Sequence, residues 1–243
     1  VGCDWLVVTG CTIDYNTTSI VLGSQDGGHI TNNYIGSVAA NPALHITSDA
    51  AATGPNYSDK IHVIDNVFNG HYDGGNTYDC IWVDGAVTPA NIIIRNNDIT
   101  FYTRYGINFT TTAALAIDGN YFAPKGGFGV TPIYNSTGAG DGAVSIRDNR
   151  FEVATTFTTM NLTFAALRGN TGCVTETNNA AVIASGTTSI AVTHGLGKTP
   201  ALGDIQVTPT NNPTNPVTFW WVDTRTATQF TINVNADPGV STL

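Results

Sequence analysis

The sequence is poor in charged residues, and this scarcity excludes several kinds of protein. Asp, Glu, Lys and Arg make up 11% of the 243 residues, with nine Lys and Arg against 18 Asp and Glu. Surface helices rely on Lys and Glu, so this composition argues against a helical architecture. With a formal charge of −9 and no basic run, the chain lacks the clustered cations that duplex nucleic acid requires. We expect no nucleic-acid partner.

Metal-ligand spacing and long apolar runs are lacking as well. No two of the four Cys form a CxxC pair, so we expect buried free thiols, no metal site and no cofactor. No apolar run approaches the length that spans a bilayer, and no membrane insertion is expected. The apolar residues, 42% of the chain, are rich in Val and Ile and favour a folded, β-rich protein.

What the sequence has in abundance is a six-residue phrase, written IRNNDI at 94–99. An apolar residue is followed by two mostly polar residues, an Asn, a variable residue and an apolar residue. Successive copies are 21 to 33 residues apart, and they begin at Val8, Ile30, Val63, Ile94, Ile117, Ile146 and Leu167. A fixed phrase with a variable spacer is typical of a solenoid of strands, in which each coil keeps its register and extra residues leave as loops.

The fourth position of the phrase predicts a ladder of stacked side chains at a bend of each coil. Equivalent residues of stacked coils lie about 4.8 Å apart, so inward amides can hydrogen-bond to those above and below. Asn also tolerates the left-handed backbone that a tight bend needs. The predicted structural ladder comprises Asn33, Asn66, Asn97, Asn120, Asn149 and Asn170, with Cys11 in the first copy.

Over about residues 5–178, these phrases resemble the right-handed parallel β-helices of the pectate-lyase-like superfamily. The resemblance implies an all-β fold, with a right-handed parallel β-helix of about seven coils at 1–178. In residues 183–243 the runs SIAVT, DIQVTP, TFWWVD and QFTINVN alternate cleanly, which predicts four strands of a small antiparallel, sandwich-like domain. This segment is similar to the C-terminal β-domain that follows β-helices in bacteriophage tail spikes and tail fibres.

The combined resemblance implies a phage tail spike or tail fibre protein that attaches to bacterial surface polysaccharide. In such proteins the C-terminal domain locks three chains together, so a homotrimer is expected. Trimerisation would also cover the solenoid ends and the aromatic face of the small domain. An N-terminal part outside this sequence is expected to join other phage tail proteins. The expected location is the virion tail, after synthesis in the bacterial host cytoplasm.

Strand alternation predicts outward columns on three successive coils. In ALHI (43–46), CIWV (80–83) and YGINF (105–109) the apolar residues point inward. The remaining side chains form one column of His45, Trp82 and Asn108 and another of Thr47, Asp84 and Thr110, with Cys80 outward as well. An exposed Trp can cover a sugar face while polar groups bind the hydroxyls. We predict a glycan-binding surface of His45, Asp79, Trp82, Arg104, Tyr105 and Asn108.

Cleavage of the same glycan is the alternative function. Hydrolysis needs two carboxylates about 5 to 10 Å apart, and Asp49 and Asp84, on adjacent coils, are the candidate catalytic pair. A lyase would instead need a base such as Tyr102 or Tyr105, with Arg104 to hold a uronate. A third interpretation is a purely structural fibre segment, with Trp82 under a loop or in a trimer interface. His194, in THGLGKTP, is expected to be a buried turn residue.

Overall fold

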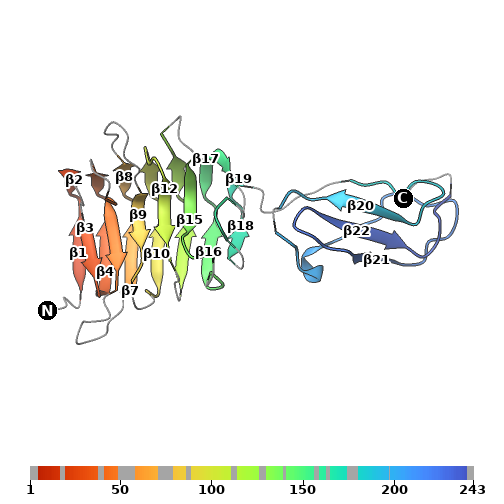
Figure 1. Cartoon of the computed structure of the whole chain (residues 1–243), viewed down its shortest axis with the longest axis horizontal. Helices are drawn as coiled ribbons and strands as arrows, with labels where there is room; N and C mark the ends of the chain where they lie inside the picture. The colour runs from red at the N-terminus through yellow and green to blue at the C-terminus, as the bar shows by residue number, and fades with distance from the viewer. Residues whose placement is uncertain are drawn as a thin grey trace. The chain divides into compact units, whose positions relative to one another are not determined.

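The computed structural model describes residues 5–16, 20–37, 41–48, 58–70, 79–85, 89–110, 114–125, 130–138, 141–155, 159–162, 165–173, 180–196 and 198–239. Almost all of the regular structure in these residues is β-strand, which confirms the all-β class. The chain divides into two compact units, Val1–Thr175 and Glu176–Leu243 (Figure 1).

The first unit consists of parallel strands in three sheets. The first sheet contains, in order, β1 (Leu6–Thr9), β4 (Asp26–Thr31), β7 (Asp59–Ile64), β10 (Ile92–Arg95), β13 (Leu115–Asp118), β16 (Val144–Arg147) and β18 (Ala166–Arg168). The second contains β2 (Thr12–Asn16), β5 (Tyr34–Ser37), β8 (Val67–Gly70), β11 (Asp98–Thr100), β14 (Tyr121–Ala123), β17 (Arg150–Thr155) and β19 (Thr171–Cys173). The third contains β3 (Ile20–Gly23), β6 (Leu44–Thr47), β9 (Asp79–Val83), β12 (Tyr105–Phe109) and β15 (Thr131–Asn135). This arrangement is compatible with a parallel β-helix.

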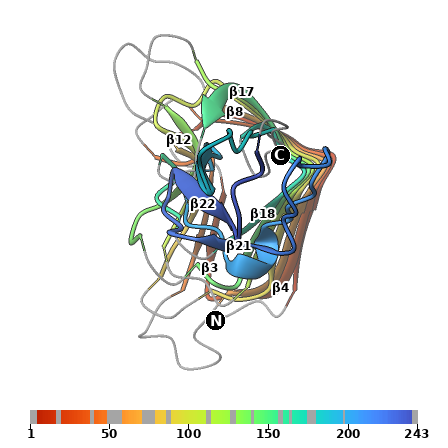
Figure 2. The same cartoon turned by 90° about the vertical axis from the view of Figure 1, so that its right-hand side faces the viewer.

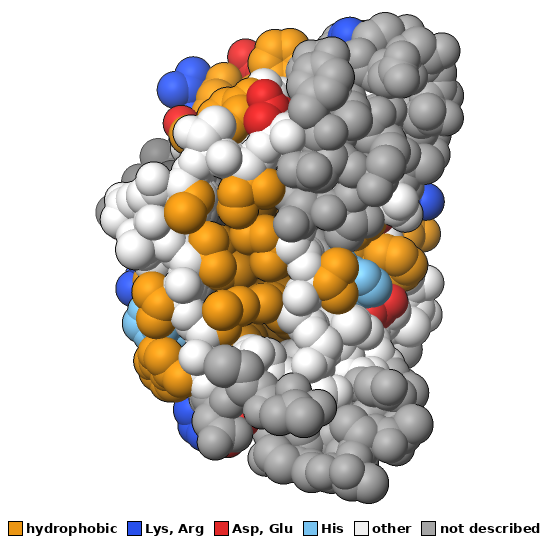
Figure 3. Space-filling view, turned by 90° about the vertical axis from the view of Figure 1, so that its left-hand side faces the viewer, with side chains coloured by type: hydrophobic (Ala, Val, Ile, Leu, Met, Phe, Trp, Pro, Cys, Tyr) orange, Lys and Arg blue, Asp and Glu red, His pale blue; other side chains and the backbone are white. Residues whose placement is uncertain are grey.

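The core of the first unit lies between the three sheets. Apolar residues from the strands of all three sheets form one buried cluster that continues from coil to coil. Figure 2 shows the backbone of successive coils lying one behind another. At the opening position of the phrase, Ile30, Val63, Ile94, Ile117 and Ile146 are all fully buried. Figure 3 looks onto the end that begins with β1, β2 and β3, and apolar side chains gather in the middle of that face.

The corner between the first and second sheets always contains two residues. The second of them is the predicted ladder residue. Its Nδ2 donates at 2.8 to 2.9 Å to the backbone oxygen of the residue that opens the preceding phrase. Its Oδ1 accepts the backbone N–H of the preceding ladder residue at 2.9 to 3.0 Å. The six Asn from Asn33 to Asn170 are thus joined in one chain of hydrogen bonds that begins at the backbone of Cys11.

The left-handed conformation expected at the ladder Asn lies one residue earlier. The first residue of every corner has a φ between 53° and 66°. Gly adopts this conformation readily because it has no Cβ, and Asn and Asp tolerate it because their short polar side chains can hydrogen-bond locally. The sequence follows this restriction in all seven copies, at Gly10, Asn32, Asp65, Asn96, Gly119, Asp148 and Gly169.

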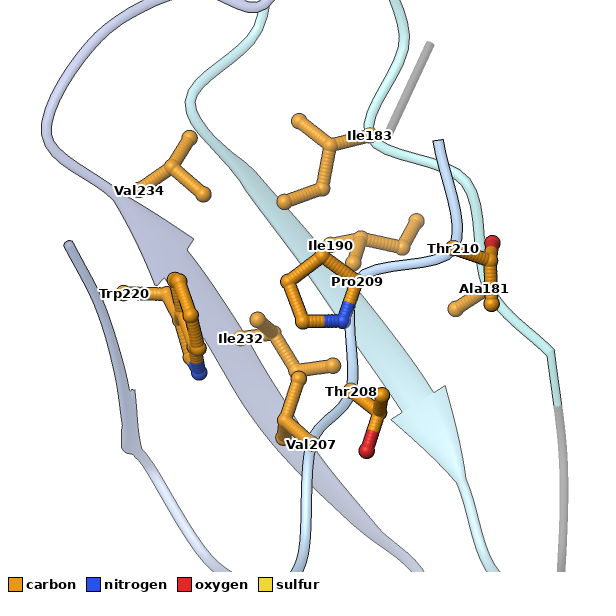
Figure 4. Close-up of a pocket in the computed structure, with 10 residues that line it drawn as sticks. All are labelled: Ala181, Ile183, Ile190, Val207, Thr208, Pro209, Thr210, Trp220, Ile232 and Val234. Atoms are coloured by element: carbon orange, nitrogen blue, oxygen red, sulfur yellow. The ribbon is translucent and has the colours of Figure 1, made fainter. Parts of the chain in front are cut away.

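The second unit has three antiparallel strands in the order β20 (Ser189–Thr193), β22 (Gln229–Val234) and β21 (Trp220–Asp223). The prediction of a fourth strand over DIQVTP is wrong, because residues 204–209 form no strand. Asp204 instead ends a short 3₁₀ turn, η1 (Leu202–Asp204), with its carboxylate accepting the N–H of Ala201 at 2.9 Å. Residues 207–210 then cover one face of the sheet without pairing to it (Figure 4). His194, directly after β20, is buried as expected, and its ring stacks on Phe230.

Two cysteines differ from expectation. Cys11 is exposed, unlike the buried Asn residues at the same corner position of the later coils. Cys80, which alternation places outward, is fully buried, with its thiol 3.6 Å from the backbone oxygen of Thr100. Within the described ranges, no helix is long and apolar enough to cross a membrane.

Candidate functional site

The outer face of the third sheet carries the candidate site. His45 pairs in register with Trp82, Trp82 with Asn108, and Asn108 with Tyr134. The side chains of one outward column therefore come from four successive coils, β6, β9, β12 and β15, at about 4.8 Å intervals. A surface built in this way is a straight row of functional groups, suited to an extended ligand.

At one end of this row, His45, Trp82 and Asp84 form a contact cluster. The imidazole Nε2 lies 2.7 Å from Asp84 Oδ1, and the imidazole stacks on the Trp82 indole with ring centroids 4.8 Å apart and 12° between the planes. Partial burial of Asp84 disfavours its charge, but hydrogen bonds from His45 and Thr47 outweigh that effect and lower the carboxyl pKa. Asp84 therefore stays ionised at neutral pH.

Stacking changes what Trp82 can offer a ligand. One indole face is covered by His45, so the prediction of a fully exposed ring that covers a sugar is wrong for that face. Within the described residues, the indole Nε1 is buried and has no hydrogen-bond partner. Trp82 is half-buried, and its ring edge, together with the His45 edge, forms the accessible apolar surface.

The neighbouring cluster is organised around the buried carboxylate of Asp79. Arg104 donates to both of its oxygens, from Nε at 2.8 Å and from Nη2 at 2.6 Å, and Asn108 donates to Oδ2 at 2.9 Å. Asn108, expected to be exposed, is only 5% exposed, since its amide oxygen also accepts a hydrogen bond from Ser136. The paired Asp79 raises the pKa of Arg104, which remains a cation with 43% of its side chain exposed.

Aromatic rings continue the row beyond Arg104. The guanidinium lies 5.3 Å from the centroid of the Tyr105 ring, and Tyr105 stacks on Tyr134 with centroids 4.2 Å apart. Burial, reinforced by Tyr134, raises the pKa of Tyr105. Tyr102 is buried, and burial likewise raises its hydroxyl pKa. Both hydroxyls remain protonated at neutral pH, where a lyase base would have to ionise.

The two described carboxylates of this face are both engaged by neighbouring side chains. Asp79 accepts from Arg104 and Asn108, and Asp84 contacts His45, so neither is a free carboxyl group of the kind that protonates a glycosidic oxygen. Asp49, the predicted partner of Asp84, lies outside the described residues. No group of three or more His, Cys, Asp or Glu in the described parts of the chain is placed to hold a metal ion.

Sequence analysis missed Tyr134 and Ser136 as members of this surface. TPIYN at 131–135 alternates like the other runs of the third sheet, and counting from the phrase at 117–122 places it on the next coil. The alternation that places Tyr134 on this surface was therefore visible in the sequence. Thr47 was assigned to the second column, where it contributes the hydrogen bond to Asp84.

The chain was compared with family models, curated proteins and solved structures. No family model, no curated protein and no solved structure matches the chain.

Proposed function

We propose that this chain is a phage tail spike or tail fibre adhesin, a homotrimer whose right-handed parallel β-helix binds bacterial surface polysaccharide. The observation that carries the glycan assignment is the straight row on the third sheet. It presents imidazole, guanidinium and aromatic groups and the Asp84 carboxylate on successive coils, spaced to meet an extended polymer. Stacked parallel coils and a separate small antiparallel unit support the tail-protein assignment.

The charges on the row favour a glycan that is neutral overall. Asp79 is paired with Arg104, and Asp84 with His45, so each carboxylate already has a partner. A polyanionic glycan would meet a chain with a formal charge of −9 and no unpaired cation cluster on the described part of this face. Hydroxyl-rich sugars can instead donate to the Asp84 carboxylate, whose side chain is 21% exposed, and accept from Arg104.

Binding rather than cleavage is the better-supported activity of this face. Asp79 is committed to a bidentate ion pair, Asp84 is held in its ionised form, and Tyr102 and Tyr105 keep their protons. These are features of a preorganised recognition surface. General acid catalysis requires a carboxyl group with a raised pKa, and Asp84 shows the opposite direction.

The test is binding to a panel of purified capsular polysaccharides and O-antigen chains, measured by calorimetry. We expect at least one to bind wild type, and Arg104→Ala or Trp82→Ala to weaken that binding at least tenfold. Ser145→Ala, on the outer face of the first sheet, is the matched control and should leave affinity unchanged. New reducing ends or unsaturated uronates would show a depolymerase. No binding to any bacterial glycan would favour a purely structural segment.

A further inference from the structure

Two histidines of the first unit lie side by side, away from the candidate glycan surface. His29 on β4 and His62 on β7 are aligned in the pairing of these two strands. The next residues, Ile30 and Val63, are buried in the core, so both imidazoles lie half-buried on the outer face of the first sheet. Because the row of the proposed function belongs to the third sheet, a site on this face is independent of glycan binding.

The ring nitrogens of this pair have no partner among the described residues. No hydrogen bond or ion pair joins His29 or His62 to another residue in that part of the chain. The other described histidines differ, because His45 Nε2 contacts Asp84 and both nitrogens of His194 contact backbone atoms. A neutral imidazole with a free nitrogen is the commonest protein ligand of metal ions. The pair therefore has the chemistry of a metal site.

The spacing of the two rings fits coordination of one shared ion. The centroids of His29 and His62 are 4.7 Å apart, and the ring planes are tilted by 53°. A metal ion lies about 2.0 to 2.1 Å from a ligating imidazole nitrogen, and hence roughly 3.2 Å from the ring centroid. Two such rings with about 90° or 109° between their bonds to the metal have centroids roughly 4.5 or 5.2 Å apart. The observed separation lies between these two values.

The surroundings of the pair are compatible with a bound cation. Trp5 packs against His29 with ring centroids 5.2 Å apart, which restricts the movement of that imidazole. The positive charge of Arg95 acts on His62, but Asp118 offsets it through an ion pair at 3.2 Å. The formal charge of the whole chain, −9, attracts cations to its surface.

We propose that His29 and His62 together bind one divalent transition-metal ion of the kind that prefers imidazole, Cu²⁺, Ni²⁺ or Zn²⁺, with water in the remaining positions. The expectation of no metal site came from Cys spacing, which does not bear on a pair of imidazoles. The ion joins β4 to β7, whose phrases begin 33 residues apart, the largest spacing in the unit. A cross-link that closes a long connection gives the largest stabilisation in theory, so the ion should stabilise these coils.

The test is a calorimetric titration of the full chain, without an affinity tag, with NiCl₂. Wild type should bind one Ni²⁺ per chain, whereas MgCl₂ should give no binding because Mg²⁺ prefers oxygen ligands. His29→Asn and His62→Asn should each weaken Ni²⁺ binding at least tenfold. The double variant should lose little more, because both ligands serve the same ion. His45→Asn is the matched control and should bind Ni²⁺ as wild type does.

Thermal unfolding gives a second measurement and shows that each variant is folded. Without metal, both variants should unfold close to wild type, since the two rings lie on the outer face. Excess NiCl₂ should raise the Tm of wild type and of His45→Asn, and leave that of His29→Asn and His62→Asn unchanged. Unchanged Ni²⁺ affinity in either single variant, loss of binding in His45→Asn, or no binding to wild type would overturn the inference. Two Ni²⁺ per wild-type chain, with one lost in each variant, would overturn shared coordination.

Discussion

Replacement of Asn97 by Ala is the sharpest test of how the first unit is held together. Asn97 lies in the middle of the ladder and is 1% exposed. Its Oδ1 accepts from the backbone N–H and the Nδ2 of Asn66, and its Nδ2 donates to the oxygens of Val63 and Asn120. The Ala side chain has no polar atom, so the variant loses all four hydrogen bonds.

The cost follows from the groups that lose their partner. Asn66 Nδ2 retains backbone acceptors at Ile30 and Ile64, and Asn120 Oδ1 still accepts from the backbone N–H of residue 97. The two groups that lose their side-chain partner without replacement are the backbone N–H of Asn66, which loses an acceptor, and the backbone oxygen of Val63, which loses a donor. An unsatisfied buried group costs about 1 to 3 kcal/mol, so the expected destabilisation is about 4 kcal/mol. For a unit of this size, that lowers Tm by roughly 8 to 16 °C.

The assay is thermal unfolding followed by circular dichroism, at one scan rate and at equal protein concentration because association shifts Tm. Asn69→Ala is the matched control. This Asn lies half-buried on the outer side of β8 and donates once, at 2.9 Å, to the Tyr34 hydroxyl, so its loss should cost about 1 kcal/mol. Equal Tm losses for the two variants would refute the conclusion that the ladder stabilises the corner.

Three further predictions concern the corner, the site and the thiols. Gly119→Ala should cost about 1 to 2 kcal/mol in chemical denaturation, because φ is +63° and a Cβ would lie 2.7 Å from Asn96 Oδ1; Asp65→Gly, at the same corner position, should stay within about 1 kcal/mol of wild type. The lowered pKa of Asp84 means that its ionised form stabilises the fold above its unfolded pKa of 3.8 and that this stabilisation is lost as pH falls through the folded value. In urea, the free energy of unfolding of wild type should therefore exceed that of Asp84→Asn at neutral pH, and this difference should disappear between pH 5 and roughly pH 2, whereas a difference that persists at the lower pH would contradict the assignment. In a Cys3→Ser chain, iodoacetamide should modify Cys11 alone in the native state, since burial raises the pKa of Cys173 to about 11 and also raises that of Cys80; mass spectrometry showing native labelling of Cys80 would contradict its burial.

The phrase made much of the first unit predictable, because each of its positions has a separate physical task. Apolar first positions are buried, fourth positions form the ladder, and the register they set aligns His45, Trp82 and Asn108. The left-handed residue was misassigned by one position, although the restriction of the third position to Gly, Asn and Asp was visible in the sequence. The left-handed residue can be located by comparing the third position of the seven copies, because each copy has Gly, Asn or Asp there.

The chemistry of the site was less predictable, because alternation gives the side of a sheet and not the contacts made there. Trp82 points outward as expected, yet an adjacent ring covers one of its faces. Asn108 also belongs to the outward column but is buried by its bonds to Asp79 and Ser136. In the second unit, DIQVTP alternates like a strand, but a Pro and the Asp204 turn leave it covering the sheet. These outcomes depend on neighbours that are distant in sequence.

The two-residue corner has a consequence for how this protein can change. Every connection between the first and second sheets has the same length, whereas successive phrases begin 21 to 33 residues apart. A residue inserted at the corner would displace an Asn from both neighbours and turn the following strand inside out. All variation in length therefore falls on the connections that enter and leave the third sheet. New recognition elements can be added beside the candidate glycan surface, one coil at a time, while the Asn ladder and the two-residue corners that hold the coils in register stay unchanged.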